Sequence, residues 1–388
     1  MAQSCRTLAS LYVAAVEPLR NKISIDLVRL IAHHLRAARP AFDTAGLIET
    51  VTPQLDTLEL KARVQLVADA IAARLPLDPA SRIDTLRAVL HPEVVEDLSA
   101  VTDERGVAGW GIWPLTTVVA DRGLDDFEAS LALLRDMTRR STAEFAVRAF
   151  LAADLDRALA VMRGWIDDPC HHVRRLVSEG TRPRLPWGRR LNALCADPTP
   201  VLPLLERLRD DPSDYVRRSV ANHLNDVAKD HPDLALDVLE TWAADAPPPR
   251  LKLIRHAART LLKAGHPRAL SLHGFHPLQA DVSPIILNRA EVRVGDNLTF
   301  TCALTSTTAT EQRVAIDYAV HYRKRSGTLA PKVFKGTTAT LAARGKLTFR
   351  KTHRFRDVTT RTHHPGAHAL SLRINGRDTP AVPFELLG

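Results

Sequence analysis

Apolar residues recur at the spacing of an α-helix through the first two thirds of the chain. Leu27, Leu30 and Ile31 follow this spacing, as does the segment LELKARVQLVADA at 58–70. A further apolar stripe runs through STAEFAVRAFLAADLDRALAVMRGW at 141–165. Amphipathic helices give this periodicity because residues three and four apart share one face. We therefore expect a mostly α-helical domain over 17–265, preceded by an extension over 1–16.

Beyond residue 282 the period of the pattern changes from 3.6 to 2. Segments 298–304, 314–322, 347–349 and 369–374 alternate apolar with polar residues, as half-buried strands do. About seven short strands separated by turn signals are typical of an immunoglobulin-like sandwich. The sequence thus predicts a small all-β sandwich domain over 282–388, joined to the helical domain by a linker over 266–281.

One helical segment occurs twice with a period of 43 residues. The first copy is DDPCHHVRRLVSE at 167–179 and the second is DDPSDYVRRSVAN at 210–222. A weaker copy follows at 253–255. A repeat of this length with helical patterning indicates a HEAT-like solenoid, in which paired helices stack and their second helices line one concave surface.

The first copy opens into an unusual cluster of charge. Between Arg174 and Arg190 there are six arginines, one acid, Glu179, and a tryptophan, Trp187, on a proline-rich loop. A carboxylate kept among arginines suggests a site that binds a polyanion and performs local chemistry. The alternative is a solvated helix face with an Arg175–Glu179 pair at i, i+4.

Two further carboxylates lie in related positions. Glu144 stands ahead of the apolar stripe of 141–165, where it could stabilise the first turn of a helix or face the groove. Asp226 follows Arg218 and Asn222 at intervals of four residues, which places all three on one face of the second repeat helix. We expect this face and Glu179 to look into the same groove.

Charge and composition favour an acidic partner. The chain of 388 residues has a net charge of +9, with 17 basic and 7 acidic residues from 282 onward, so the basic excess lies in the predicted sandwich. Four scattered cysteines lack metal-ligand spacing and fit a reducing cytoplasm, and no apolar run is long enough to span a membrane. Zinc spacings, glycine-rich phosphate loops and Ser-His-Asp constellations are absent, so we expect neither a metal nor a cofactor.

Several strings of the helical part resemble one family. They are EPLRN at 17–21, AFDTAGLI at 41–48, LELKARVQLVADA at 58–70, TAEFAVRAFL at 142–151, HVRRLVSEGTRPRLPW at 172–187 and DPSDYVRRSVANHLNDVAKDHP at 211–232. Together they resemble the HEAT-like-repeat DNA glycosylases of the AlkC branch, relatives of AlkD, from about residue 17 to 265. The predicted sandwich is similar to the immunoglobulin-like domain that one AlkC subgroup carries.

The resemblance implies a monofunctional DNA glycosylase of base excision repair. Such enzymes hydrolyse the N-glycosidic bond of 3-methylcytosine and 3-methyladenine in duplex DNA, without a deep base-flipping pocket. The catalytic carboxylates of the family fall on Glu144, Glu179 and Asp226, and its active-site tryptophan on Trp187. We expect phosphate contacts from a set of arginines: Arg148, Arg174, Arg175, Arg182, Arg184, Arg189, Arg190, Arg217 and Arg218.

This chemistry agrees with the residue types. N3 methylation makes the base cationic and a good leaving group, so the protein has to stabilise an oxocarbenium-like sugar and position a water. A tryptophan face attracts a cationic base, and arginines hold phosphates. No lysine lies between Gly180 and Lys229, so no lyase step is expected.

Two other interpretations stay open on sequence alone. The chain could be a non-catalytic HEAT-repeat scaffold, or a protein that binds distorted DNA without releasing a base. The leading hypothesis has alkylated double-stranded DNA as partner, no membrane association, a monomeric state and a cytoplasmic location.

Overall fold

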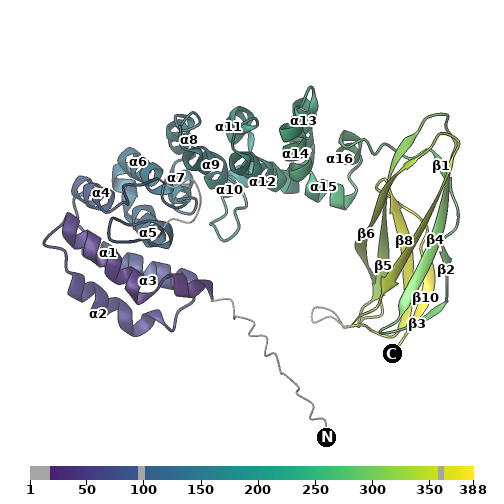
Figure 1. Ribbon diagram of the computed structural model, residues 1–388, viewed down its shortest axis with the longest axis horizontal. Coiled ribbons are helices and arrows are strands. Elements are labelled where there is room, and N and C mark those ends of the chain that lie inside the picture. Colours follow the sequence, from purple (N-terminus) through teal and green to yellow (C-terminus); the bar gives the residue numbers. More distant parts are fainter. Residues whose placement is uncertain (1–17, 95–100, 357–361) are drawn as a thin grey trace, which may run out of the picture. The chain divides into compact units, whose positions relative to one another are not determined.

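The computed structural model describes residues 18–94, 101–356 and 362–388 (Figure 1). The predicted N-terminal extension, 1–16, lies outside the described residues. The chain divides into two compact units, Met1–His223 and Leu224–Gly388. The division falls inside helix α12 (Asp214–Asp230).

The first unit is built of helices, as the 3.6-residue period predicts. In chain order they are η1 (Leu19–Lys22), α1 (Ile25–Ala38), α2 (Thr44–Leu55), α3 (Leu60–Ala72), α4 (Pro79–Ala88), η2 (Gly109–Gly111), α5 (Ile112–Arg122), η3 (Gly123–Asp126), α6 (Phe127–Thr138), α7 (Val147–Ala153), α8 (Leu155–Arg163), α9 (His171–Gly180), α10 (Asn192–Ala196), η4 (Thr199–Val201) and α11 (Leu202–Leu208). The predicted stripe Val173, Leu176 and Val177 of α9 is fully buried. The amphipathic pattern therefore identifies the core-facing side correctly.

The 43-residue repeat is visible in matching hydrogen bonds at the starts of α9 and α12. The carboxylate of Asp168 accepts a bond from the backbone N–H two residues on, and so does that of Asp211. Arg174 Nη1 donates to the carbonyl of Asp168 at 2.8 Å, and Arg217 Nη1 donates to that of Asp211 at 2.5 Å. Arg174 also holds the Asp211 carboxylate with two bonds of 2.6 and 2.9 Å. One repeat is thereby tied to the next.

The second unit begins with the end of α12 and continues with helices and strands. The helices are α13 (Pro232–Ala243), α14 (Pro248–Ala257), α15 (Arg259–Ala264) and α16 (Pro267–Leu272). The strands are β1 (Ala280–Val282), β2 (Ile286–Leu287), β3 (Glu291–Arg293), β4 (Asn297–Ser306), β5 (Gln312–Arg323), β6 (Leu329–Leu341), β7 (Lys346–Arg354), β8 (Gly366–Ile374), β9 (Arg377–Asp378) and β10 (Val382–Leu387). Residues 266–281, expected to be a linker, thus contain α16 and the start of β1. Pro267 fits the first turn of α16, and Leu270 is buried in it.

Two sheets form the predicted sandwich. One has the strand order β1-β4-β2, with β7 paired to β4, and the other has the order β3-β10-β8-β5-β6. Alternate side chains of β4 and β5, among them Phe300, Val314 and Ile316, meet in one buried core. Cys302 lies in this core as a free thiol. Hydrophobic packing joins the sheets there.

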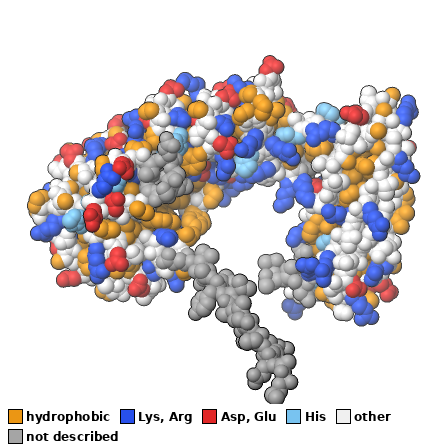
Figure 2. Space-filling model, viewed as in Figure 1, with side chains coloured by type: hydrophobic (Ala, Val, Ile, Leu, Met, Phe, Trp, Pro, Cys, Tyr) orange, Lys and Arg blue, Asp and Glu red, His pale blue; other side chains and the backbone are white. Residues whose placement is uncertain are grey.

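The surface of the sandwich carries its basic excess. Figure 2 shows Lys and Arg side chains spread over the visible face of the strands, with few acidic ones between them. None of the helices in residues 18–94, 101–356 and 362–388 combines the length and the apolar character that crossing a membrane requires.

Candidate active site

Glu179 occupies the last turn of α9 and is only 5% exposed. The apolar face of α9 packs into the core, and this last turn is buried with it. Its carboxylate is held on both oxygens, because Arg182 Nη1 donates to Oε1 at 2.6 Å and Ser219 Oγ donates to Oε2 at 2.6 Å. Arg175 lies one helical turn earlier, with Nη2 at 3.4 Å from Oε1. A buried carboxylate fixed in this way is preorganised for electrostatic work.

Glu144 is joined to the same network through Arg175. It lies in the turn before α7, outside the helix, so it does not serve as the first-turn acid of α7. Arg175 Nη1 donates to Glu144 Oε2 at 2.6 Å, and Thr142 Oγ1 donates to the same oxygen at 2.9 Å. Arg175 therefore bridges the two carboxylates, and the network of Glu144, Arg175, Glu179 and Arg182 is balanced in charge.

The electrostatics of the network favour the ionised form of Glu179. Burial by itself raises the pKa of this carboxyl, but the charges of Arg175 and Arg182 and the hydrogen bond from Ser219 outweigh it. The pKa of Glu179 consequently lies below its ordinary value of 4.5. Burial also acts to lower the pKa of Arg175, yet the two carboxylates raise it overall. At neutral pH the site thus holds fixed charges of both signs.

Trp187 lies on the loop between α9 and α10 in a left-handed backbone conformation with φ of 64°. This conformation is costly for a bulky residue and is found where the surroundings enforce it. Lys61 Nζ on α3 donates to the Trp187 carbonyl at 2.5 Å, while the indole is 61% exposed. Leu19, Leu60 and Trp187 are among the residues that line an open groove of about 690 Å³. The loop therefore leaves Trp187 exposed beside this groove.

Arg148 shapes this loop from inside. Its side chain is 0% exposed, and Nη1 donates to the carbonyls of Gly180 and Arg182, both at 2.8 Å. Nε donates to the carbonyl of Arg189 at 2.6 Å. A buried guanidinium used in this way cannot reach a phosphate, which corrects the expectation that Arg148 contacts DNA.

The other arginines divide by exposure. Arg174, Arg175, Arg182 and Arg217 are largely buried and bonded to carboxylates or carbonyls of the protein. Arg184 is half-buried, whereas Arg189, Arg190 and Arg218 are exposed. Arg218 Nη2 also lies 3.1 Å from Asp214 Oδ2. The exposed arginines are the candidates for phosphate contact, and the buried ones hold the repeats and the carboxylates in place.

Asp226 belongs to the second unit, on the part of α12 that follows His223. It is 1% exposed, and Lys229 Nζ donates to its Oδ1 at 2.8 Å. It is thus a buried carboxylate with a cationic partner, like Glu179. That Asp226 shares one concave patch with Glu144, Glu179 and Trp187 stays a prediction.

Comparison with known proteins places the chain in a family. Residues 120–261 match the family model described as DNA alkylation repair enzyme, and residues 281–388 match the C-terminal Ig-like domain of YhaZ. The structure of Pseudomonas fluorescens alkylpurine DNA glycosylase AlkC, bound to DNA with an abasic site analog, is 36% identical. It aligns with a TM-score of 0.78 over 96% of this chain and 100% of that one. The chain belongs to the AlkC branch of the DNA alkylation repair family.

A second relative of this AlkC-type chain is the uncharacterized protein YhaZ of Bacillus subtilis. It is 34% identical over 380 residues, which is 95% of this chain and 99% of YhaZ. The similarity therefore covers both the helical part and the sandwich, and YhaZ shares the domain organisation.

The structure adds residues to the candidate site that the sequence analysis missed. The Arg175 guanidinium lies over the Tyr215 ring, 4.8 Å from the ring centre, and the Ser219 hydroxyl donates to Glu179. The repeat contains a signal for both, because Tyr215 and Ser219 replace His172 and Leu176 of the first copy. A hydroxyl at a core position of a repeat needs a buried partner, and Glu179 is that partner.

Across 18–94, 101–356 and 362–388, no three His, Cys, Asp or Glu side chains gather so as to hold a metal ion. The site is thus described by carboxylates, arginines, hydroxyls and one indole.

Proposed function

We propose that the chain is a monofunctional DNA glycosylase of base excision repair that hydrolyses the N-glycosidic bond of N3-alkylated bases, 3-methylcytosine and 3-methyladenine, in duplex DNA. The observation that carries this proposal is the ionised, buried carboxylate of Glu179 between Arg175, Arg182 and Ser219. The similarity to an alkylpurine DNA glycosylase along the whole chain supports it.

The proposed chemistry uses the charge of Glu179. An N3-alkylated base is cationic and leaves readily, so the barrier lies in the positive charge that develops on the sugar. A carboxylate with a lowered pKa stays negative and can stabilise that charge without first losing a proton. It is a poor general acid for the same reason. Glu144 contributes by orienting Arg175, and either carboxylate can align the attacking water.

Access to the carboxylates limits how DNA can bind. Only small fractions of the Glu144 and Glu179 side chains face solvent. We infer that the sugar approaches this narrow edge from outside and that the base need not enter a deep pocket. The exposed face of Trp187 then offers a surface that attracts the cationic base.

Phosphate contacts fall to the exposed arginines in this proposal. Arg189 and Arg190 follow Trp187 on its loop, and Arg218 is exposed on α12. They can neutralise backbone phosphates and give binding a strong salt dependence. Asp226 is proposed as a third carboxylate of the site.

The decisive experiment measures base release from methylated duplex DNA, resolved by lesion. We expect free 3-methylcytosine or 3-methyladenine, with the DNA strand intact until alkali cleaves the abasic product. A Glu179→Gln variant should be deficient in the release of methylated base. Glu49→Gln, the same change at an exposed site on α2, should release base as wild type does. Binding without release of any methylated base would reject the glycosylase and favour a scaffold or a distortion-binding protein.

A further inference from the structure

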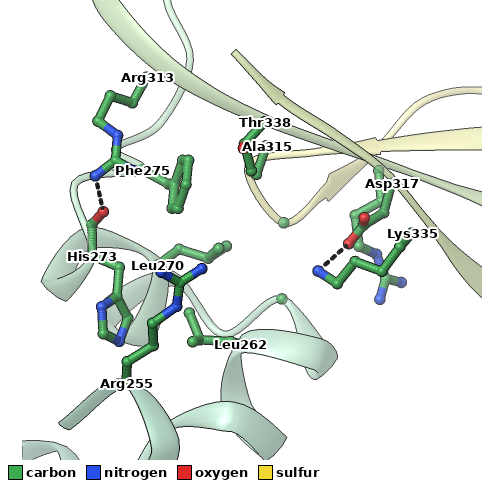
Figure 3. Close-up of a pocket in the computed structure, with 13 residues that line it drawn as sticks. Arg255, Leu262, Leu270, His273, Phe275, Arg313, Ala315, Asp317, Lys335 and Thr338 are labelled. Atoms are coloured by element: carbon green, nitrogen blue, oxygen red, sulfur yellow. Dashed lines mark hydrogen bonds and ion pairs between the residues drawn. The ribbon is translucent and has the colours of Figure 1, made fainter. Parts of the chain in front are cut away.

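A cavity of about 160 Å³ lies in the second unit, where helices α14 to α16 meet strands of the sandwich (Figure 3). The helical side contributes Arg255 and His273, and the strand side contributes Arg313 and Lys335. Apolar side chains such as Leu270 also line the cavity. Basic and apolar side chains together thus line the cavity.

The two sides of the cavity are fixed to each other by close backbone contact. Gly265 follows α15 with φ of 80°, and Gly376 forms the turn after β8 with φ of 83°. A Cβ on Gly376 would stand 2.5 Å from the carbonyl oxygen of Gly265, so glycine is required there. Asn375 Nδ2 donates to the carbonyl of His276 at 2.7 Å. The helical and strand backbones on either side of the cavity are therefore held close together.

Positive charge around the cavity exceeds negative charge. The lining includes three arginines and one lysine but a single carboxylate, Asp317. Lys335 Nζ lies 3.3 Å from Asp317, and Arg373 forms two bonds to Asp378 at 2.7 and 2.8 Å. Arg255 and Arg313 remain.

Neither remaining arginine is neutralised within the described residues. Arg313 Nη1 donates to the carbonyl of His273 at 2.8 Å, and its guanidinium lies 4.6 Å from the ring centre of Phe275. Arg255 has no carboxylate partner among 18–94, 101–356 and 362–388. Two positive charges that share a cavity without a counter-charge repel each other, so an anion between them would be stabilised.

His273 provides a second, independent indication of a ligand. Its Nε2 is buried and makes no hydrogen bond to any described residue. Buried polar atoms normally have a partner, and a missing one points to a group that binds there. Burial first, and then the charges of Arg255 and Arg313, lower the pKa of His273, so the ring is neutral at pH 7. A neutral ring with its proton on Nε2 donates one hydrogen bond to an acceptor.

We propose that this cavity binds a phosphate group, held by Arg255, Arg313 and the Nε2–H of His273. A phosphate offers several acceptor oxygens in different directions, which matches donors that converge from helices and strands. The group can come from a phosphodiester of DNA or from inorganic phosphate in solution. Only the first source rests on the proposed function.

The first test titrates the full-length chain with inorganic phosphate by calorimetry, in a buffer without other oxyanions. We expect binding, which Arg255→Gln weakens about tenfold or more because one charge-assisted hydrogen bond is lost. Arg350→Gln is the matched control, since Arg350 is exposed on β7 and does not line the cavity. Melting temperatures of all variants show whether they remain folded.

The second test measures affinity for unmodified duplex DNA across a salt series. If a DNA phosphodiester is the ligand, Arg255→Gln lowers the salt slope by about one, and Arg350→Gln serves again for comparison. If inorganic phosphate is the ligand, calorimetric binding is lost in Arg255→Gln while DNA affinity stays unchanged. NMR of the His273 ring in the wild-type chain adds a readout that needs no variant, since bound phosphate should raise the pKa of His273.

The proposal is overturned if wild type and Arg255→Gln behave alike in both titrations. It is also overturned if phosphate leaves the His273 resonances unchanged and the DNA salt slopes coincide. Neither result depends on base release, so loss of this proposal and loss of the glycosylase proposal are separable.

Discussion

Replacing Glu179 by glutamine tests the central electrostatic argument. Glutamine keeps the size of the side chain and one acceptor oxygen, which can retain the Arg182 bond, while its amide NH2 then faces the Ser219 hydroxyl, which has to turn from donor to acceptor. It removes the negative charge and changes one hydrogen-bonding atom, with little change of shape. The variant therefore separates the charge of the carboxylate from its shape.

The expected loss follows from the geometry. A carboxylate about 4 Å from a full positive charge on the sugar is worth about 4 kcal/mol at an effective dielectric constant near 20. The sugar carries only part of a charge in the transition state, and Arg175 and Arg182, at 3.4 and 2.6 Å from Glu179, offset some of the attraction. We therefore expect a loss of about 2–3 kcal/mol, or roughly 30- to 150-fold in the rate of base release.

Stability needs its own control, because the same change leaves two arginines short of a partner. Removing one member of a buried ion pair costs about 3–5 kcal/mol of unfolding free energy, and glutamine should cost less than that upper range. The double variant Glu179→Gln, Arg182→Gln restores the balance of charge. It should melt closer to wild type than the single variant and still be deficient in base release.

Single-turnover release of methylated base, with enzyme in excess over lesion duplex, is the appropriate assay because it isolates the chemical step. DNA affinity is measured in parallel. A folded Glu179→Gln protein that binds DNA and releases base at the wild-type rate would refute the role of the charge. Recovery of activity in the double variant would show that Glu179 acts only by neutralising Arg182.

Four further predictions follow from particular contacts. Because the pKa of Glu179 is lowered in the folded chain, its contribution to stability is full above about pH 4.5 and is lost as pH falls through the folded value, which acid unfolding of wild type against Glu179→Gln will show. Trp187→Gly should be more stable than Trp187→Ala by roughly 1 kcal/mol of unfolding free energy, since φ is positive there. Both variants should release less base than wild type. Arg148→Met should cost roughly 3 kcal/mol in denaturant unfolding because three carbonyls, two of them in buried hydrogen bonds, lose a donor, whereas Arg190→Gln should change only DNA affinity. Deleting 282–388 removes a net charge of +10, so DNA binding should become weaker and less salt-sensitive while the helical repeats still fold; overlapping excision curves across a salt series would contradict a DNA role for the sandwich.

Secondary structure was largely predictable because it depends on local periodicity. The stripe of Val173, Leu176 and Val177 and the alternation in β4 and β5 each follow from residues close in sequence. The long strand β6 was not predicted, since its burial pattern does not alternate cleanly at the edge of its sheet. Helix α16 was not predicted because the histidines, Gly274 and Pro277 of its segment favoured a linker.

The candidate site was predictable in part for a different reason. The arginine-rich string around Glu179 marks the place, and the strings shared with the AlkC branch mark Glu144, Asp226 and Trp187 as well. The resemblance provided roles for these residues that no periodicity could provide. It could not say which arginines are free to meet a phosphate.

The sequence by itself determined the helical repeats, the sandwich, the 43-residue period and the position of the central carboxylate. Only the tertiary structure decided that Arg148 supports a loop from inside, that Arg175 bridges two carboxylates and that Ser219 completes the site. The physical reason is the reach of a long side chain. An arginine can extend across to a neighbouring repeat or loop 30 or 40 residues away, so its partner, and hence its burial and its charge balance, depends on packing that local sequence does not encode.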